Sequence, residues 1–220
     1  MCFSAQASFV AGSVLLAVGA VTLKQVRVRS ELPYAAIPGL FGVQQLIEGG
    51  LWLALASGQS HLVSALTHLY AFFSHVLWPV FVPLAVLAIE PVGWRRRLLA
   101  AFAVAGGATG FYQLYFLLTE PTFAQVVGRH VDYISPHFYV PAVLALYVLA
   151  TCGSSLASSH RRVRWFGIAT FVSLIAAGAL YQTWFISVWC FFAAGISWIV
   201  LLHFLEPRSS ETSRLPAISR

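Results

Sequence analysis

The feature that most constrains this chain is a series of long apolar runs separated by short polar stretches. A helix needs roughly 20 mostly apolar residues to cross the hydrocarbon core of a membrane. Seven runs approach that length, at residues 5–23, 32–56, 62–89, 98–118, 136–152, 165–181 and 185–205. Only 9% of the 220 residues are charged, against about 25% in soluble domains. The sequence therefore predicts an all-α, polytopic membrane helix bundle with seven transmembrane helices, and it excludes soluble enzymes and nucleic-acid-binding proteins.

The basic residues predict how these spans are oriented. Of the 13 Lys and Arg residues, 12 fall in alternate connections or in the C-terminal tail, and only Arg129 falls on the opposite side. The positive-inside rule then places the N-terminus outside and the C-terminus in the cytoplasm, and it explains the net charge of +6 without an anionic partner. The first run precedes Lys24 instead of following a basic segment, so we interpret it as a retained span. Residues 1–206 are expected to form one domain and 207–220 a disordered cytoplasmic tail.

Polar residues inside the predicted spans give a candidate site. Glu48 is the only carboxylate well inside an apolar run, and ionisable groups there usually face the bundle interior or a water-filled cavity. Glu48 and His75 lie on consecutive spans and differ by about 7 Å in depth from the connection between them. We therefore expect the two to face each other in an outward-opening polar cavity. The other candidate ligand- or ion-binding residues are Gln44, Gln45, Gln113 and His68.

Two interpretations of these residues remain open. In the first, Glu48 titrates or holds a cation, His75 is its proton partner, and Gln45 and Gln113 orient the ligand. In the second, Glu48 is a neutral carboxyl group that joins two helices by a hydrogen bond. A structural role is favoured for His68, which lies nearer the mouth of the cavity.

The remaining histidines and aromatic residues have simpler interpretations. His130 and His160 are expected in solvated loops, and His203 is expected near the membrane interface. Aromatic residues such as Trp78 and Trp189 are typical of interface belts or packing. A pocket with aromatic walls is the alternative.

A metal ion is one option for the unknown cofactor, with Glu48 and His75 as the candidate ligands. Such a pair is incomplete, because a structural zinc site has four protein ligands and a catalytic zinc site has three, with water in the fourth position. His68 and His75 are about 10.5 Å apart along a straight helix and cannot easily share one ion. The sequence contains neither HExxH nor GxSxG, so it assigns no catalytic residue. Cys2 and Cys190 both fall near the predicted outer side, and we expect them to approach each other closely enough for a disulfide.

Parts of the sequence resemble a known type of protein. The resemblance is carried by Met1-Cys2-Phe3-Ser4-Ala5, Gln44-Gln45, Glu48-Gly49, Trp52, Trp78-Pro79 and Pro83. These residues are similar to those of an uncharacterised family of small bacterial multi-pass membrane proteins. The similarity covers the first 90 residues or so well and the remainder loosely. It implies the bacterial inner membrane and about seven helices, and it implies no activity.

Three functions follow as hypotheses. The first is binding, and translocation, of a small solute, ion or proton through an outward-facing polar pocket. The second is a membrane-embedded enzyme, metal-dependent or not, that acts on a lipid or small molecule at the outer leaflet. The third is a receptor-like or structural subunit. Membrane lipids are expected partners, a homo-oligomer is an open alternative, and no nucleic acid is expected.

Overall fold

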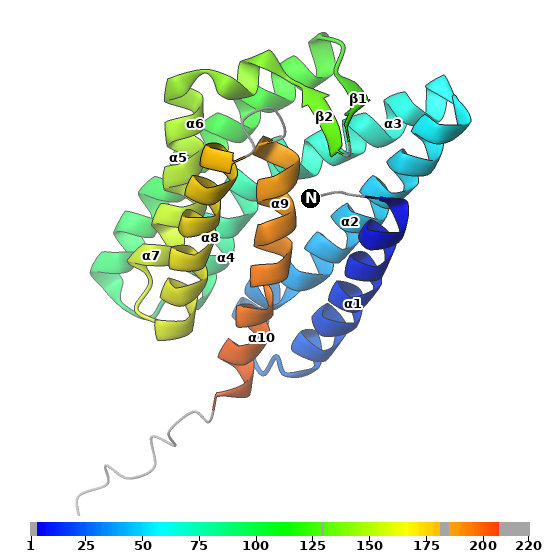
Figure 1. The fold of residues 1–220 in the computed structure, drawn as a ribbon. Helices are drawn as coiled ribbons and strands as arrows, with labels where there is room; N and C mark the ends of the chain where they lie inside the picture. Colours follow the sequence, from blue (N-terminus) through cyan, green and yellow to red (C-terminus); the bar gives the residue numbers. More distant parts are fainter. Residues whose placement is uncertain (1–3, 129, 181–184, 207–220) are drawn as a thin grey trace, which may run out of the picture.

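The computed structural model describes residues 4–128, 130–180 and 185–206, and this part of the chain is a helical bundle with one small hairpin (Figure 1). All seven predicted runs are helical where they are described. Four runs form single helices: α1 Ala5–Lys24, α2 Leu32–Ser57, α5 Gly93–Thr119 and α8 Arg161–Leu180. The other three runs are divided. The third consists of α3 Ser60–Ala71, η2 Phe72–Leu77 and α4 Trp78–Ile89, and the fifth corresponds to α6 Pro141–Val148, η4 Leu149–Gly153 and α7 Ser154–Ala157. The last consists of α9 Phe185–Ile196 and α10 Trp198–Leu205. Short 3₁₀ turns, η1 Arg29–Glu31 and η3 Pro136–Tyr139, precede α2 and α6.

The length and apolar character of the helices are those of a multi-pass membrane protein. Within the described residues, five segments are long and apolar enough to cross a membrane: Ala5–Lys24, Ser60–Ile89, Gly93–Thr119, Arg161–Leu180 and Ser187–Leu205. The α2 helix has sufficient length, at 26 residues, but Gln44, Gln45 and Glu48 reduce its mean hydropathy. Pro141–Ala157 is apolar but shorter. The seven-span count and the orientation therefore remain predictions.

Helices α1 and α2 pack backbone to backbone along a seam of glycines. A Cβ atom placed on Gly19 would lie 2.6 Å from the Cα of Gly39, and one on Gly42 would lie 2.9 Å from the backbone nitrogen of Leu16. Real Cβ atoms do not approach backbone atoms so closely, so larger residues would push the helices apart. Small residues are the usual means of close helix packing in membranes, where no hydrophobic force drives two helices together.

Two π-helical segments widen neighbouring helices at the middle of the bundle. The segment η2 lies between α3 and α4, and η4 lies between α6 and α7. A π turn leaves backbone groups without their regular helical partners, and such turns are frequent at functional sites. Here the Tyr147 hydroxyl donates to the carbonyl oxygen of Ser74 at 2.6 Å and joins the two widened regions. Pro79 and Pro83 follow η2 on α4, and proline lacks the backbone N–H that a regular helical turn uses.

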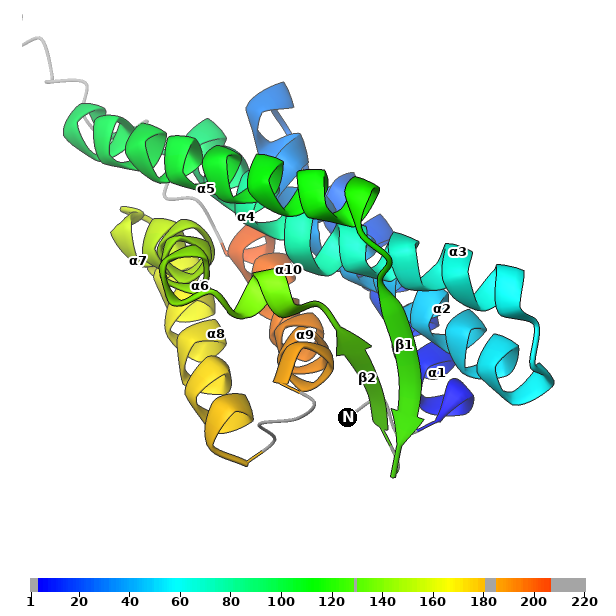
Figure 2. The ribbon, with the colours of Figure 1, turned by 90° about the horizontal axis from the view of Figure 1, so that it is seen from above.

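A β-hairpin occupies the region where the sequence predicted only a long loop. Strands β1 Phe123–Val127 and β2 His130–Ile134 pair antiparallel, with Phe123 opposite Ile134 and Val127 opposite His130. Gly128 has φ 66° at the turn, a conformation that glycine adopts at little cost. Figure 2 shows the hairpin beside α3 and α9, against which β1 and β2 pack. The expectation of a solvated His130 is wrong, because β2 buries its side chain to 8% exposure.

The opposite end of the bundle, which we call the Glu90 end, is held by the buried carboxylate of Glu90. One carboxylate oxygen accepts hydrogen bonds from the Ser158 hydroxyl at 3.0 Å and the Ser159 N–H at 2.8 Å, and the other accepts from the Val92 N–H at 3.3 Å. Burial by itself would raise the pKa of the Glu90 carboxyl, but the hydrogen bonds from Ser159, Ser158 and Val92 outweigh it and lower the pKa below its usual value. This carboxylate therefore joins the end of α4 to the turn before α8.

Candidate functional site

The polar residues of α2 are all inside the bundle. Gln44, Gln45 and Glu48 are each 0% exposed. Gln44 accepts a hydrogen bond through Oε1 from the indole N–H of Trp78 at 2.7 Å, and Glu48 accepts one through Oε1 from the Ser187 hydroxyl at 3.1 Å. The predicted face of α2 that carries Gln44 and Glu48 thus points to α4 and α9.

Gln45 has a different setting, because its amide oxygen and amide nitrogen have no hydrogen-bond partner among the described residues. Nearly all buried polar groups in proteins are hydrogen-bonded to protein or to ordered water. A fully buried amide with both ends unpartnered is therefore a position where water or a ligand is expected.

His75 lies on the π segment η2 and is 3% exposed. Its Nδ1 is 2.6 Å from the hydroxyl oxygen of Ser74, and that hydroxyl is 3.0 Å from the carbonyl oxygen of Tyr70. Because Ser74 has one hydroxyl hydrogen and directs it to the carbonyl, Nδ1–H of His75 is the donor to Ser74. Nε2 is then the acceptor nitrogen, and within the described chain it has no partner.

His75 lines a cavity beside the base of the hairpin, which we call the hairpin cavity. Its volume is about 30 Å³, which is room for about one or two water molecules. The amide nitrogen of Gln113, also without a partner in the described residues, contributes a donor to the same wall. At the rim, His137 stacks on Phe116 and pairs with Glu120 at 2.8 Å. The structure therefore places His75 and Gln113, two of the candidate residues, in the lining of one cavity.

Glu48 and His75 have separate surroundings. The described hydrogen bonds of Glu48 lead to Ser187 on α9, whereas His75 bonds Ser74 and packs against Phe138, with 4.5 Å between ring centroids. No hydrogen bond or ion pair joins Glu48 to His75 in the described parts of the chain. His68 is apart from both: its Nδ1 bonds the carbonyl oxygen of Ser64 at 2.8 Å on a more exposed face of α3.

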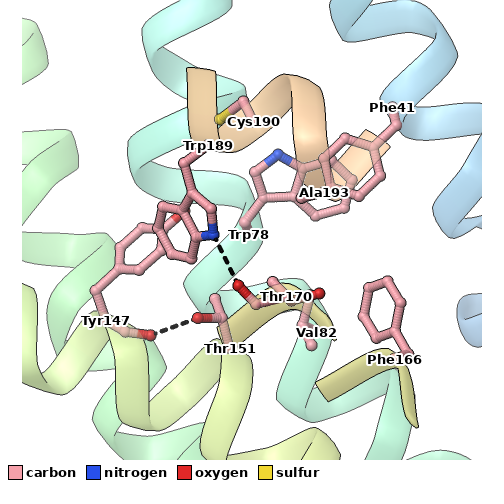
Figure 3. Close-up of a pocket in the computed structure, with 10 residues that line it drawn as sticks. All are labelled: Phe41, Trp78, Val82, Tyr147, Thr151, Phe166, Thr170, Trp189, Cys190 and Ala193. Atoms are coloured by element: carbon pink, nitrogen blue, oxygen red, sulfur yellow. Dashed lines mark hydrogen bonds between the residues drawn. The ribbon is translucent and has the colours of Figure 1, made fainter. Parts of the chain in front are cut away.

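An aromatic pocket adjoins the Gln44 side of α2 (Figure 3). Phe41 and Trp78 stack with their centroids 3.9 Å apart, and Tyr147 and Trp189 pack at 5.5 Å on another wall. The Cys190 thiol lines the pocket and interacts with the Gln44 side chain. The volume is about 30 Å³, so the pocket is nearly filled by its own side chains. The sequence offered an aromatic-walled pocket only as the alternative to an interface belt.

A larger cavity of about 540 Å³ lies at the Glu90 end, where sequence reasoning placed only loops and the interface. His160 and His203 meet there edge to face with centroids 5.0 Å apart, and Nε2 of His160 bonds the Ile89 carbonyl at 2.9 Å. The carboxylates of Glu31, Glu90 and Glu206 and the guanidinium of Arg161 also line it. No sequence motif links its members, because they come from three connections and the end of α10, which are far apart in the chain.

The described residues contain no group of three or more His, Cys, Asp or Glu side chains arranged to hold a metal ion. Glu48 and His75 do not supply one together, since they bond different partners. The predicted approach of Cys2 to Cys190 falls outside the described residues, because Cys2 is not among them.

The sequence as a whole can now be compared with known proteins. The model of a family of unknown function, DUF6629, matches residues 1–215. The chain belongs to the DUF6629 family. No curated protein and no solved structure gives a match. The family model covers nearly the whole chain. Membership of DUF6629 assigns no activity to the buried polar residues.

Proposed function

We propose that this protein binds a small polar solute, ion or proton at buried polar groups within the membrane, and that it passes this ligand across. The observation that carries the proposal is a set of buried polar atoms on Gln45, His75 and Gln113 that have no hydrogen-bond partner among the described residues, and these side chains come from α2, η2 and α5. A buried polar atom without a partner costs about 1–3 kcal/mol. A helix bundle that only has to be stable has no need of three such side chains.

The hairpin cavity supports a ligand that both donates and accepts hydrogen bonds. Nε2 of His75 offers an acceptor and the Gln113 amide offers a donor, and the cavity volume suits one or two water-sized molecules. Water with an excess proton meets this requirement, and so does a small hydroxylated or hydrated species. On the α2 side of the bundle, Glu48 is the group whose charge would change when a proton binds. A seven-span arrangement with the hairpin outside, in a bacterial inner membrane, is part of the same proposal.

Proton flux into proteoliposomes is the direct test. The vesicles contain a pH-sensitive dye, and a potassium diffusion potential drives protons inward. The wild-type chain should acidify the lumen faster than empty vesicles do, while Glu48→Gln and His75→Gln should lower the rate to that of empty vesicles. His61→Gln, at an exposed position on α3, is the matched control and should keep the wild-type rate.

Assembly of each variant is measured by size-exclusion chromatography in detergent. If Glu48→Gln does not yield a monodisperse protein, the carboxyl group is a structural link between α2 and α9, and the first interpretation of Glu48 is lost. If both variants assemble and conduct like the wild type, translocation through these residues is excluded.

A second candidate function is a membrane-embedded enzyme, and one contact favours it. The Ser187 hydroxyl donates to the Glu48 carboxylate, and Cys190 follows three residues later on α9. A hydroxyl beside a carboxylate is one arrangement for an activated nucleophile. A fluorophosphonate probe followed by peptide mass spectrometry should label Ser187 if the hydroxyl is activated, with Ser187→Ala as the control. Absence of label at Ser187 in the folded protein would argue against the enzyme.

A further inference from the structure

A groove runs along the outside of the bundle between α8 and α9, away from the buried polar residues. Figures 1 and 2 show these two helices side by side. The groove has a volume of about 580 Å³. On α8 the lining residues recur at helical spacing, so they form one continuous face. This face comprises Trp165, Ile168, Ala169, Val172, Ser173 and Ala176.

The surface of the groove is apolar and open. Trp165 is 48% exposed and Val172 is 57% exposed. The one hydroxyl in the α8 wall, that of Ser173, donates to the Thr170 carbonyl at 2.7 Å and is therefore satisfied within the helix. On the α9 side the lining residues are Phe191, Phe192, Gly195 and Ile196. Such a surface, within two segments long and apolar enough to span a membrane, is suited to hydrocarbon.

The length of the groove matches one leaflet. Trp165 and Ala176 are separated by 11 positions, which is about 16 Å along an α-helix. The hydrocarbon core of a bilayer is about 30 Å thick, so one acyl chain extends about 15 Å. A single chain lying beside α8 would therefore reach from the level of Trp165 to the end of the groove.

Two arginines lie on α8 at the Trp165 end of the groove. Arg161 and Arg162 precede Trp165 by four and three residues, so they continue the same helix face. Arg162 pairs with Glu206 at 2.7 Å, and both side chains are partly exposed, at 38% and 46%. This pair joins the start of α8 to the residue that follows α10. Within the described part of the chain, the Arg161 guanidinium makes no hydrogen bond or ion pair, and Arg161 also lines the cavity at the Glu90 end. A tryptophan at this level is typical of the lipid headgroup region.

We propose that the α8–α9 groove binds one acyl chain of an anionic phospholipid, whose phosphate is held by Arg161 and Arg162. Guanidinium groups bind phosphate oxygens in pairs of parallel hydrogen bonds, and the phosphate would compete with Glu206 for Arg162. Basic groups beside helix grooves are suited to anionic headgroups. The site is independent of the proposed translocation, because it shares none of Gln45, His75 or Gln113.

The test is lipid retention, measured by native mass spectrometry of the full chain after exchange into detergent with added dioleoylphosphatidylglycerol or dioleoylphosphatidylcholine. The wild type should retain phosphatidylglycerol in preference to phosphatidylcholine. The Arg161→Gln/Arg162→Gln double variant should bind phosphatidylglycerol about 30-fold more weakly, given the contribution of each basic residue near an anionic surface, and should lose the preference.

Gly195→Leu tests the groove itself. A Cβ atom at Gly195 meets no atom within 4 Å, so the new side chain enters the groove without disturbing the backbone. Gly107→Leu on α5 is the matched control, because a Cβ there also meets no atom within 4 Å. Gly195→Leu should lose bound phosphatidylglycerol and Gly107→Leu should keep it. Equal retention in the two variants, or equal binding of both lipids by the wild type, would overturn the proposal. A wild-type dimer that Gly195→Leu converts to a monomer would assign the groove to a second copy of the chain instead.

Discussion

The Glu90 end and the hairpin end of the bundle treat buried polar groups in opposite ways. At the Glu90 end, a carboxylate 1% exposed receives three hydrogen-bond donors from the α4–α5 and α7–α8 connections. Toward the hairpin end, His75 and Gln113 each have a buried nitrogen without a partner in the described chain. Fully paired groups stabilise one packed arrangement, whereas unpartnered groups reduce stability and are available to a ligand. This difference identifies the Glu90 carboxylate as a structural link and the groups near the hairpin as a candidate site.

The largest expected effect is at Glu90. Replacing it by leucine leaves the Ser158 hydroxyl buried without an acceptor and the Ser159 and Val92 N–H groups partly buried without one, and each fully buried group of this kind costs about 1–3 kcal/mol. We expect Glu90→Leu to lower the free energy of unfolding by about 3 kcal/mol or more, measured by thermal unfolding in detergent. The control is Glu206→Leu, which removes an exposed ion pair and should cost less than about 1 kcal/mol. Equal losses in the two variants would contradict the comparison.

The pH dependence of stability provides the next test. The pKa of Glu90 is lowered in the folded protein, so its contribution is fully present above the unfolded-state pKa, about 4.3. It is lost as the pH falls through the folded pKa. The wild-type melting temperature should therefore fall on acidification below about pH 4.3 more steeply than that of Glu90→Leu. Parallel curves would show that this carboxylate does not carry the effect.

A smaller effect is expected at Trp78, whose indole N–H donates to Gln44 at 2.7 Å. Trp78→Phe retains an aromatic ring against Phe41 but loses this buried hydrogen bond, at a cost of about 1–2 kcal/mol. Trp94→Phe, at a position 62% exposed, should leave the melting temperature unchanged. If Trp78→Phe is equally neutral, the α2–α4 link does not contribute to stability.

The smallest effect on stability is expected at Gln45. Its amide makes no hydrogen bond to a described residue, so Gln45→Leu removes two unsatisfied atoms and should change the unfolding free energy by less than about 1 kcal/mol, in either direction. Proton flux into vesicles should nevertheless fall. A loss of several kcal/mol would instead identify Gln45 as a structural residue and would weaken the contrast between the two ends.

The helices could be predicted from sequence because long apolar runs determine them directly. The rotation of each helix could not, because it depends on packing. Glu48 and His75 were placed at similar depths, yet Glu48 turns toward Ser187 on α9 while His75 turns toward the hairpin cavity. The role of Glu90 was hidden for a related reason, since its donor Ser158 is 68 residues away in the chain. The hairpin does have a local signal in the sequence, a glycine between two short runs that contain β-branched residues.

The glycine seam between α1 and α2 has a consequence for how the chain enters the membrane. These two helices are synthesised before α5 and the helices after it, and their backbones meet at Gly19 and Gly39. Because domains and their parts form in the order of synthesis, we expect the pair to leave the insertion machinery as a closed helical hairpin while α5 and the helices after it are still unmade. Every later helix is then added to a preformed pair of helices. A larger residue at Gly19 would therefore impair membrane insertion before the polar interior has been assembled.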